Sequence, residues 1–210
     1  MFATNINRSA MTAFGVAACA LLLTAGAAVS QSAAPPAAAG APSEASIVEA
    51  LKSKGATRGV ANNPDTALIA ALKQKSTRGI AISPEERGKL ADAVKDLPDQ
   101  DMEILFELNS AEISPKARPN IDALGRALQN AQLKGSSFLL AGHTDASGSS
   151  KLNQTLSERR AQTVRQLLID EFKLTNEQFI AVGYGPERLK DSKNPFASEN
   201  RRVQVVNLGE

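Results

Sequence analysis

One segment near the middle of the chain restricts the fold more than any other. The apolar run from Phe138 to Ala141 ends at Gly142, a polar loop covers residues 145–154, and a helix follows whose apolar side carries Ala161, Val164, Leu167 and Leu168. A short apolar run bounded by glycine is typical of a buried central strand. The segment therefore predicts a strand, a loop and an amphipathic helix in succession, as found in folds that layer helices on a sheet.

The patterns on either side extend this unit to a complete domain. Ser83-Pro84-Glu85-Glu86 is a capping box with proline at the first helical position, and Pro98 ends that helix. Apolar residues alternate with polar ones over residues 102–108, which predicts a half-buried strand. A second helix opens at Ser114-Pro115, and its core-facing residues are Ile121, Leu124 and Leu128. With further strands at 179–182 and 203–205, the order β-α-β-α-β-β predicts an α+β two-layer sandwich.

Size and charge restrict the function only broadly. The chain has 210 residues, of which 42% are hydrophobic, so it can hold one ordinary domain and additional segments. The formal net charge is +2, and the two signs are interspersed. This balance predicts neither a nucleic-acid-binding surface nor a polybasic membrane patch.

Residues 1–30 are predicted to be a secretory signal peptide. Arg8 is their single charged residue and precedes an apolar run from Ala10 to Val29 that ends among small residues. An uncleaved membrane anchor is one alternative, because a spanning helix needs roughly 20 apolar residues. Lipidation of Cys19, the only cysteine, is another, because Val16-Ala17-Ala18 before it is similar to a lipobox. Against lipidation, the apolar run continues after Cys19, which is equally compatible with an unmodified residue inside the signal.

Residues 31–82 are predicted to be a tether followed by an arm. Alanine, proline, serine and glycine dominate residues 31–46, a composition typical of flexible linkers. Residues 50–61 and 71–81 then form a short repeat in which each copy contains Thr-Arg-Gly. We interpret the arm as a solvated, partly disordered segment. The alternative is a docking surface at residues 47–82 for an envelope protein or the cell-wall polymer. Residues 83–210 form the predicted domain.

Three motifs in the domain carry the functional prediction. Ala141-Gly142-His143-Thr144-Asp145 is followed by Leu156-Ser157-x-x-Arg160-Ala161, and Asn200-Arg201-Arg202-Val203 lies near the C-terminus. An aspartate at a strand end and an arginine on the next helix can hold a zwitterion, because the carboxylate accepts from its ammonium and the guanidinium donates to its carboxylate. This is recognition chemistry and needs no nucleophile.

Together with Ile104–Ile113 and Gly183-Tyr184-Gly185, these motifs resemble the OmpA-like C-terminal domain, a peptidoglycan-binding module of porin-type proteins, peptidoglycan-associated lipoproteins and flagellar stator proteins. The resemblance implies that Asp145 and Arg160 bind the diaminopimelate of peptidoglycan stem peptides. It implies further ligand contacts and pocket walls at Asn109, Ser110, Thr144, Leu156 and Ala161, with Arg201 behind them. It also places unsatisfied backbone N–H groups at the start of the Leu156-Ser157 helix, where they favour an anion.

The expected protein is therefore a noncovalent peptidoglycan binder in the periplasm or at the outer membrane of a Gram-negative bacterium, joined to that membrane only indirectly or through a lipid on Cys19. A single histidine and the lack of metal-ligand spacing argue against an enzyme, a metal or a cofactor. His143 is expected to be a hydrogen-bonded packing residue. The alternative function is a periplasmic adaptor whose arm binds a protein partner. A stator-type ion channel is excluded because residues 10–42 contain no carboxylate.

Overall fold

Four strands form one mixed sheet. β1 (Asp99–Met102), β4 (Val203–Gly209), β2 (Ser137–His143) and β3 (Phe179–Gly185) are neighbours in that order. The β2–β3 pair is parallel and the other two pairs are antiparallel. The computed structural model describes residues 42–52, 64–107 and 109–209, all of which belong to one compact unit, Pro36–Glu210.

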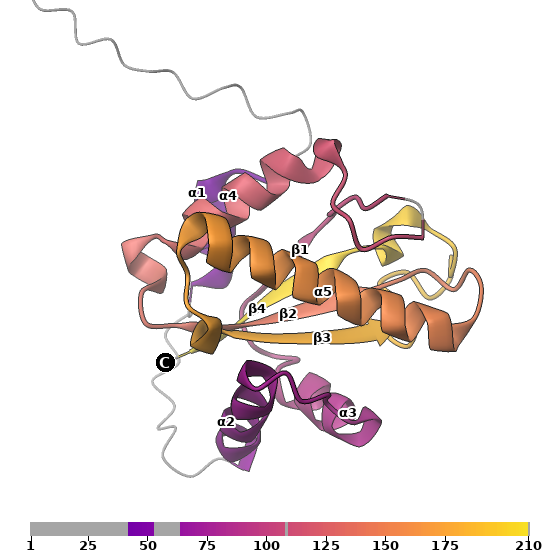
Figure 1. Ribbon diagram of the computed structural model, residues 1–210, viewed down its shortest axis with the longest axis horizontal. Coiled ribbons are helices and arrows are strands. Elements are labelled where there is room, and N and C mark those ends of the chain that lie inside the picture. The colour runs from indigo at the N-terminus through magenta and orange to yellow at the C-terminus, as the bar shows by residue number, and fades with distance from the viewer. Residues whose placement is uncertain (1–41, 53–63, 108, 210) are drawn as a thin grey trace, which may run out of the picture. The chain divides into compact units, whose positions relative to one another are not determined.

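Helices cover both faces of this sheet (Figure 1). Helices α1 (Glu44–Leu51), α4 (Arg118–Leu128) and α5 (Ser150–Phe172) pack on one face, and α2 (Pro64–Thr77) and α3 (Pro84–Ala93) pack on the other. Short 3-10 turns occur at η1 (Pro115–Ala117), η2 (Ala131–Leu133), η3 (Asn176–Gln178) and η4 (Ser198–Asn200). The α+β class and the order β-α-β-α-β-β are confirmed, and α2 with α3 adds a layer to the predicted sandwich.

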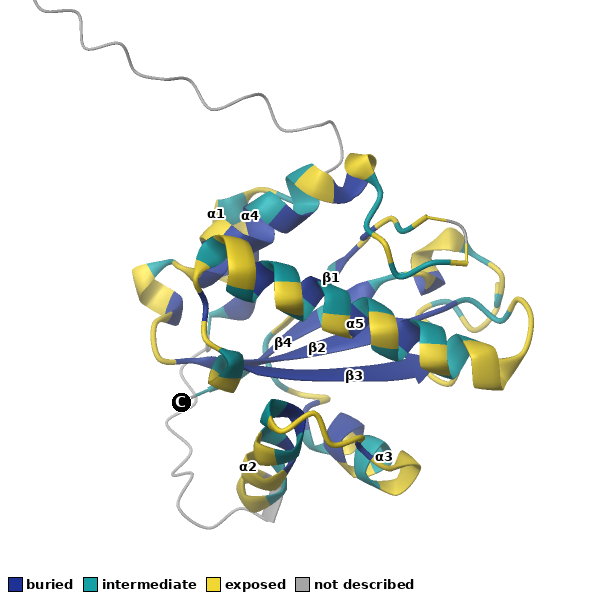
Figure 2. Ribbon diagram, in the orientation of Figure 1, coloured by how far each residue is buried: buried dark blue, intermediate teal, exposed yellow. Residues whose placement is uncertain are grey.

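The central strand β2 shows why two apolar cores form. Side chains alternate along a strand, so Phe138 and Leu140 join the core under α1, α4 and α5, whereas Leu139 and Ala141 join the core under α2 and α3. Every residue of β2 and β3 is buried, and each helix is exposed only on its outer side (Figure 2). An apolar run without alternation is therefore what a strand covered on both faces requires.

Two helix predictions are confirmed in detail. At the start of α3, Ser83 Oγ accepts from the Glu86 backbone N–H at 3.2 Å, and the Glu86 carboxylate accepts from the Ser83 N–H at 2.9 Å. This reciprocal pair is the capping box that the sequence predicted. In α4, the three predicted core residues Ile121, Leu124 and Leu128 are all buried.

The first strand was predicted at the wrong place. Ladder pairing with β4 covers Asp99–Met102, and after it only an isolated bridge joins Phe106 to Ile113 among the described residues. Met102 pairs with Val203, the first residue of β4, so no partner strand continues beside residues 103–107. Ile104 is nevertheless buried, because the chain still passes over the core. Alternating apolar residues indicate only that one side of a segment is buried. Both strands and extended loops can have one buried side, so the pattern does not distinguish them.

The described part of the segment predicted to be a solvated arm is instead packed against the sheet. Ile47, Val48 and Leu51 of α1 are buried in one core, and Leu72 of α2 is buried in the other. The Ser76 hydroxyl of α2 accepts from the Ala181 N–H of the edge strand β3 at 3.4 Å, and Lys73 donates to the Ser137 hydroxyl at 2.6 Å. Both helices therefore belong to the packed structure of the domain.

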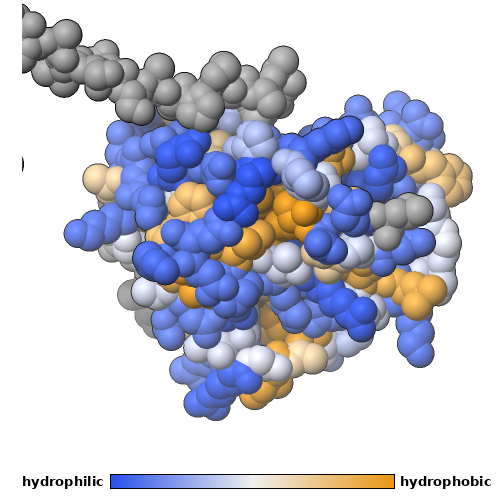
Figure 3. Space-filling view, turned by 45° about the horizontal axis from the view of Figure 1, so that its top comes forward, coloured by the Kyte–Doolittle hydropathy of each residue, from blue (hydrophilic) through white to orange (hydrophobic). Residues whose placement is uncertain are grey.

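Several predictions fall outside the described residues. They concern the signal peptide at 1–30, Cys19, most of the tether, and the first Thr-Arg-Gly copy at residues 57–59. Across residues 42–52, 64–107 and 109–209, no helix has both the length and the apolar character needed to cross a membrane. The space-filling view shows a mainly hydrophilic face on which apolar patches are interspersed (Figure 3).

Candidate functional site

Helix α5 lies unusually close to the sheet, and this contact positions the candidate site. A Cβ atom added to Gly142 of β2 would lie 2.2 Å from the Ser157 carbonyl oxygen, and one added to Gly183 of β3 would lie 2.3 Å from the Glu158 nitrogen. The buried Ser157 hydroxyl accepts from the Gly185 N–H at 2.9 Å and donates to the Gln154 carbonyl at 2.8 Å. The two glycines therefore allow α5 to pack closely on β2 and β3, and the hydrogen bonds of Ser157 hold the helix there.

Asp145 follows β2 on a loop held by its own hydrogen bonds. The Ser147 N–H donates to Asp145 Oδ1 at 3.0 Å, and the Asn153 side chain donates to the Ser147 carbonyl at 2.7 Å. Thr144 is anchored before it, because its N–H donates to the Gly185 carbonyl at 3.0 Å. Asn153 thus fixes the loop.

Arg160 projects from α5 toward the loop that follows residue 107. Its Nε donates to the Ser110 carbonyl at 3.1 Å, and its guanidinium carbon lies 4.7 Å from the centroid of the Phe106 ring. Burial, and then the nearby charge of Arg201, lower the pKa of Arg160 from its usual value, while Asp145 opposes them. Its two terminal nitrogens make no hydrogen bond to the described residues, so the donor pair that a carboxylate needs is available.

Asp145 forms an ion pair with Arg201. Nη1 of Arg201 donates to Asp145 Oδ2 at 2.8 Å, and the two side chains are 47% and 13% exposed, respectively. Burial raises the pKa of Asp145, but the hydrogen bonds from Arg201 and Ser147 together lower it below its usual value. The carboxylate is therefore ionised at neutral pH. With Arg160 beside this pair, the cluster has two positive charges and one negative charge.

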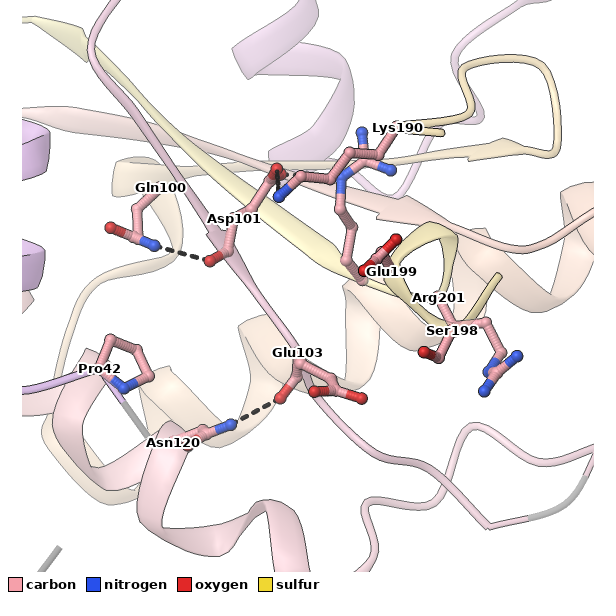
Figure 4. A pocket seen from close by; sticks show the side chains of 10 residues that line it. Pro42, Gln100, Asp101, Glu103, Asn120, Lys190, Ser198, Glu199 and Arg201 are labelled. Carbon is pink, nitrogen blue, oxygen red and sulfur yellow. Dashed lines mark hydrogen bonds and ion pairs between the residues drawn. The ribbon is translucent and has the colours of Figure 1, made fainter. Parts of the chain in front are cut away.

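A recess of about 490 Å³ is lined in part by Arg201 (Figure 4). Its charged lining residues are Asp101, Glu103, Lys190, Glu199, Arg201 and Arg202. Lys190 Nζ donates to Asp101 Oδ2 at 2.8 Å, and the Asn120 side chain donates to the Glu103 carbonyl at 2.6 Å. A lining with charges of both signs suits a polar ligand that carries ammonium and carboxylate groups.

The other residues predicted to contact the ligand or line its pocket differ in how exposed they are. Ser110 contributes its carbonyl to Arg160, whereas its hydroxyl accepts from the Glu112 N–H at 2.9 Å. Asn109 is exposed and adopts a left-handed conformation with φ of 52°. Thr144 and Ala161 are buried, and Leu156 is half-buried. Ala161 therefore offers little surface to a ligand and packs beneath the helix instead.

The predicted anion site at a helix start is wrong. Helix α5 begins at Ser150, so Leu156 and Ser157 lie in its second turn, and their backbone N–H groups belong to the hydrogen-bonded helix. The sequence placed the helix start too late because the polar residues 150–154 were read as loop. Of the two glycines beside Tyr184, Gly183 permits the close approach of α5, and Gly185 has a positive φ of 53°.

His143 packs as predicted but lacks the predicted hydrogen bond. Its ring stacks on Tyr184 with centroids 5.5 Å apart, and neither nitrogen has a hydrogen-bond partner of normal geometry among the described residues. Burial, and then the charge of Arg202, lower the pKa of His143 to about 3.

The sequence motifs around this site match a known protein family. The model of the OmpA family matches residues 105–202, a range that contains Asp145, Arg160 and Arg201. Residues 105–202 form an OmpA-like domain. The matched residues include α4, β2, α5 and β3 and end just before β4, whereas the helices α1–α3 and the strand β1 precede them.

Two curated relatives are similar to part of this chain. The chain is 31% identical over 115 residues to outer membrane porin F of Pseudomonas aeruginosa, which covers 54% of this chain and 32% of the porin. It is 34% identical over 104 residues to the peptidoglycan-associated lipoprotein of Legionella pneumophila, covering 49% of this chain and 57% of the lipoprotein. The chain therefore spans about one third and just over half of the lengths of these two relatives. Their names agree with the location expected in the periplasm or at the outer membrane of a Gram-negative bacterium.

Two solved structures are also similar. A crystal structure of the peptidoglycan-associated lipoprotein from Burkholderia pseudomallei matches with a TM-score of 0.42 and 24% identity, covering 50% of this chain and 87% of that chain. An outer membrane protein from Borrelia burgdorferi B31 matches with a TM-score of 0.40 and 29% identity, covering 51% of this chain and 84% of that chain.

Arg201 lies where the resemblance placed it, behind the predicted ligand contacts, because it donates to Asp145. Sequence reasoning missed the role of Phe106. It was read as a strand residue, yet its ring lies under the Arg160 guanidinium. The two residues are 54 positions apart in the sequence, and no local pattern indicates a contact between them.

Proposed function

We propose that the OmpA-like domain binds peptidoglycan noncovalently by recognising the zwitterionic centre of diaminopimelate. The proximity of Asp145 to Arg160, within a cluster that also holds Arg201, supports this proposal most strongly. The ligand carboxylate accepts from the terminal nitrogens of Arg160, whose plane is held by Ser110 and Phe106. The ligand ammonium donates to Asp145, which is ionised at neutral pH.

The ion pair with Arg201 does not block this role. The donors to Asp145 are Ser147, whose N–H bonds Oδ1, and Arg201, which bonds Oδ2. A carboxylate offers about four acceptor positions. An ammonium group can therefore join Arg201 at Asp145 without displacing it. The name of the Legionella pneumophila relative, a peptidoglycan-associated lipoprotein, supports the same ligand.

Cosedimentation with purified diaminopimelate-type peptidoglycan tests the proposal. The full chain should pellet with the polymer, whereas folded Asp145→Ala and Arg160→Ala variants should stay in solution. Removing one partner of such a contact costs on the order of 2–5 kcal/mol, because the other charge is left unpaired. Arg159→Ala is the matched control, since Arg159 is the exposed neighbour of Arg160 on the same helix. Equal pelleting of all four proteins would count against the site.

The adaptor alternative has less support from the described residues. A docking arm needs a free apolar or charged surface, but α1 and α2 bury Ile47, Leu51 and Leu72 against the domain. Arg165 also donates to the Ser76 carbonyl at 3.3 Å, which fixes the end of α2 to α5. In the second Thr-Arg-Gly copy, Arg78 and Gly79 follow the end of α2 and are exposed, so a partner could reach them there or on the exposed side of the helix.

A further inference from the structure

A second recess lies between α3 and the sheet, on the face opposite α5. Its volume is about 240 Å³, and the side chains that give it chemical character are Lys95, His143, Tyr184, Arg188 and Arg202. Tyr184 stacks on His143, and the Arg188 guanidinium carbon lies 5.6 Å from the centroid of the Tyr184 ring. Neither the diaminopimelate proposal nor the adaptor alternative uses these residues.

Two buried side chains beside this recess have unused hydrogen-bonding atoms. His143 is 3% exposed and both of its ring nitrogens lack a partner among the described residues; the Arg188 backbone lies close to the ring without completing a bond of normal geometry. The Arg202 side chain is 10% exposed, and its Nη1 also lacks a partner. Buried polar atoms normally have hydrogen-bond partners, because leaving one unpaired is energetically costly. Here two side chains with unpaired atoms line the same recess.

The charges around Arg202 favour an anionic ligand. Asp101 accepts from Arg202 Nε at 2.8 Å and from Lys190 Nζ at 2.8 Å, so one carboxylate serves two cations. Figure 4 shows Lys190 against Asp101. Arg188 is balanced by Asp92 at 3.3 Å. Asp99, which accepts from the neutral Gln204 side chain at 2.8 Å, also lines the recess, and its negative charge offsets that of Lys95. One positive charge therefore remains over at the Arg202 cluster.

We propose that this recess binds a small oxyanion, a carboxylate or phosphate group, between His143 and Arg202. One ligand oxygen accepts from Arg202 Nη1, and a second accepts from an imidazole N–H. Arg188 and Lys95 also line the recess, where Asp92 and Asp99 balance their charges. Drug-sized ligands occupy about 300–1,000 Å³, so a volume of about 240 Å³ suits a small anion or the anionic end of a larger molecule.

The composition of the chain supplies two reporters for a test. His143 is the only histidine and Tyr184 the only tyrosine, so the NMR signals of both rings are assigned without further work. The full chain at pH 7, in a buffer free of phosphate and carboxylate, is titrated with inorganic phosphate in one series and with acetate in another, at constant ionic strength. We expect a saturable shift of the His143 signals in at least one series, and the responding series identifies the preferred oxyanion.

Variants distinguish oxyanion binding at this recess from a general effect of added ions on the NMR signals. Arg202→Gln should weaken the binding at least tenfold, whereas Arg159→Gln, which removes the same charge from the exposed side of α5, should leave it unchanged. If Arg202→Gln does not fold, His143→Phe keeps the ring stacking, removes the N–H donor, and is followed through Tyr184. Shifts that are linear in both series, or that are the same in the folded variants and the unaltered chain, would overturn the proposal.

Discussion

Arg201 Nη1 donates to Asp145 Oδ2 at 2.8 Å, so the carboxylate predicted to receive a ligand ammonium already has a cationic partner. The exposures of 47% and 13% mean that water reaches Arg201 more easily than Asp145. Exposed ion pairs of this kind contribute about 0–1 kcal/mol. The pair therefore holds Asp145 ionised and in position without competing strongly with a ligand.

Replacing Arg201 should accordingly have a small effect on ligand binding. We expect Arg201→Gln to change the affinity for a soluble diaminopimelate-containing peptide by less than about fivefold, which corresponds to roughly 1 kcal/mol. Isothermal titration calorimetry of this variant beside Arg160→Gln provides the comparison. A loss as large as that of Arg160→Gln would mean that Arg201 is itself a main ligand contact.

The buried histidine makes stability depend on pH. The pKa of His143 is lowered to about 3 in the folded protein, whereas an unfolded histidine titrates near 6.5, so the unfolded state alone gains a proton between these values. Stability should fall by about 2 kcal/mol from pH 7.5 to pH 5. Urea unfolding at both pH values measures this loss. The His143→Phe variant should lose clearly less over the same interval, and an equal loss in both proteins would refute the assignment.

The packing of α2 predicts different costs for two nearby residues. Leu72 is fully buried and Leu72→Ala should lower the free energy of unfolding by about 2–5 kcal/mol. Ile80 is 49% exposed, so Ile80→Ala should change it by less than about 0.5 kcal/mol. Denaturant unfolding of both variants compares them directly. Equal small effects would instead indicate a solvated arm at residues 64–82.

Two glycines should respond to alanine with opposite signs. A Cβ at Gly183 would lie 2.3 Å from the Glu158 nitrogen, so Gly183→Ala should destabilise the domain by about 1–3 kcal/mol and move α5 together with Arg160. Gly88 in α3 has open space around it, and Gly88→Ala should stabilise by about 0.5–1 kcal/mol. Thermal unfolding distinguishes the two, and a neutral Gly183→Ala would contradict the close packing of α5 on the sheet.

Local patterns predicted much of the fold. The strand at Phe138–Ala141, the capping box at Ser83 and the core face of α4 were all readable because burial, capping and helical spacing act within a few residues. The end of β1 was not, since it depends on where β4 begins, about a hundred residues later. The start of α5 was also missed, because a polar first turn has the composition of a loop.

The candidate site was predictable only in part for the same reason. The motifs identified Asp145 and Arg160 as a recognition pair, and the structure brings both into one cluster with Arg201. The platform under Arg160 depends on Phe106, and the packing of α1 and α2 depends on two cores that form only once the sheet is assembled. Such contacts leave no periodic signal in the chain.

The most direct test compares two soluble stem peptides that differ only in one residue, diaminopimelate or lysine. Lysine keeps the side-chain ammonium but lacks the second carboxylate, so Arg160 would be left without its partner. The zwitterion account predicts that the full chain binds the diaminopimelate peptide more tightly by on the order of 30-fold or more, the equivalent of at least about 2 kcal/mol. Equal affinity for the two peptides would contradict recognition of the zwitterion by Asp145 and Arg160.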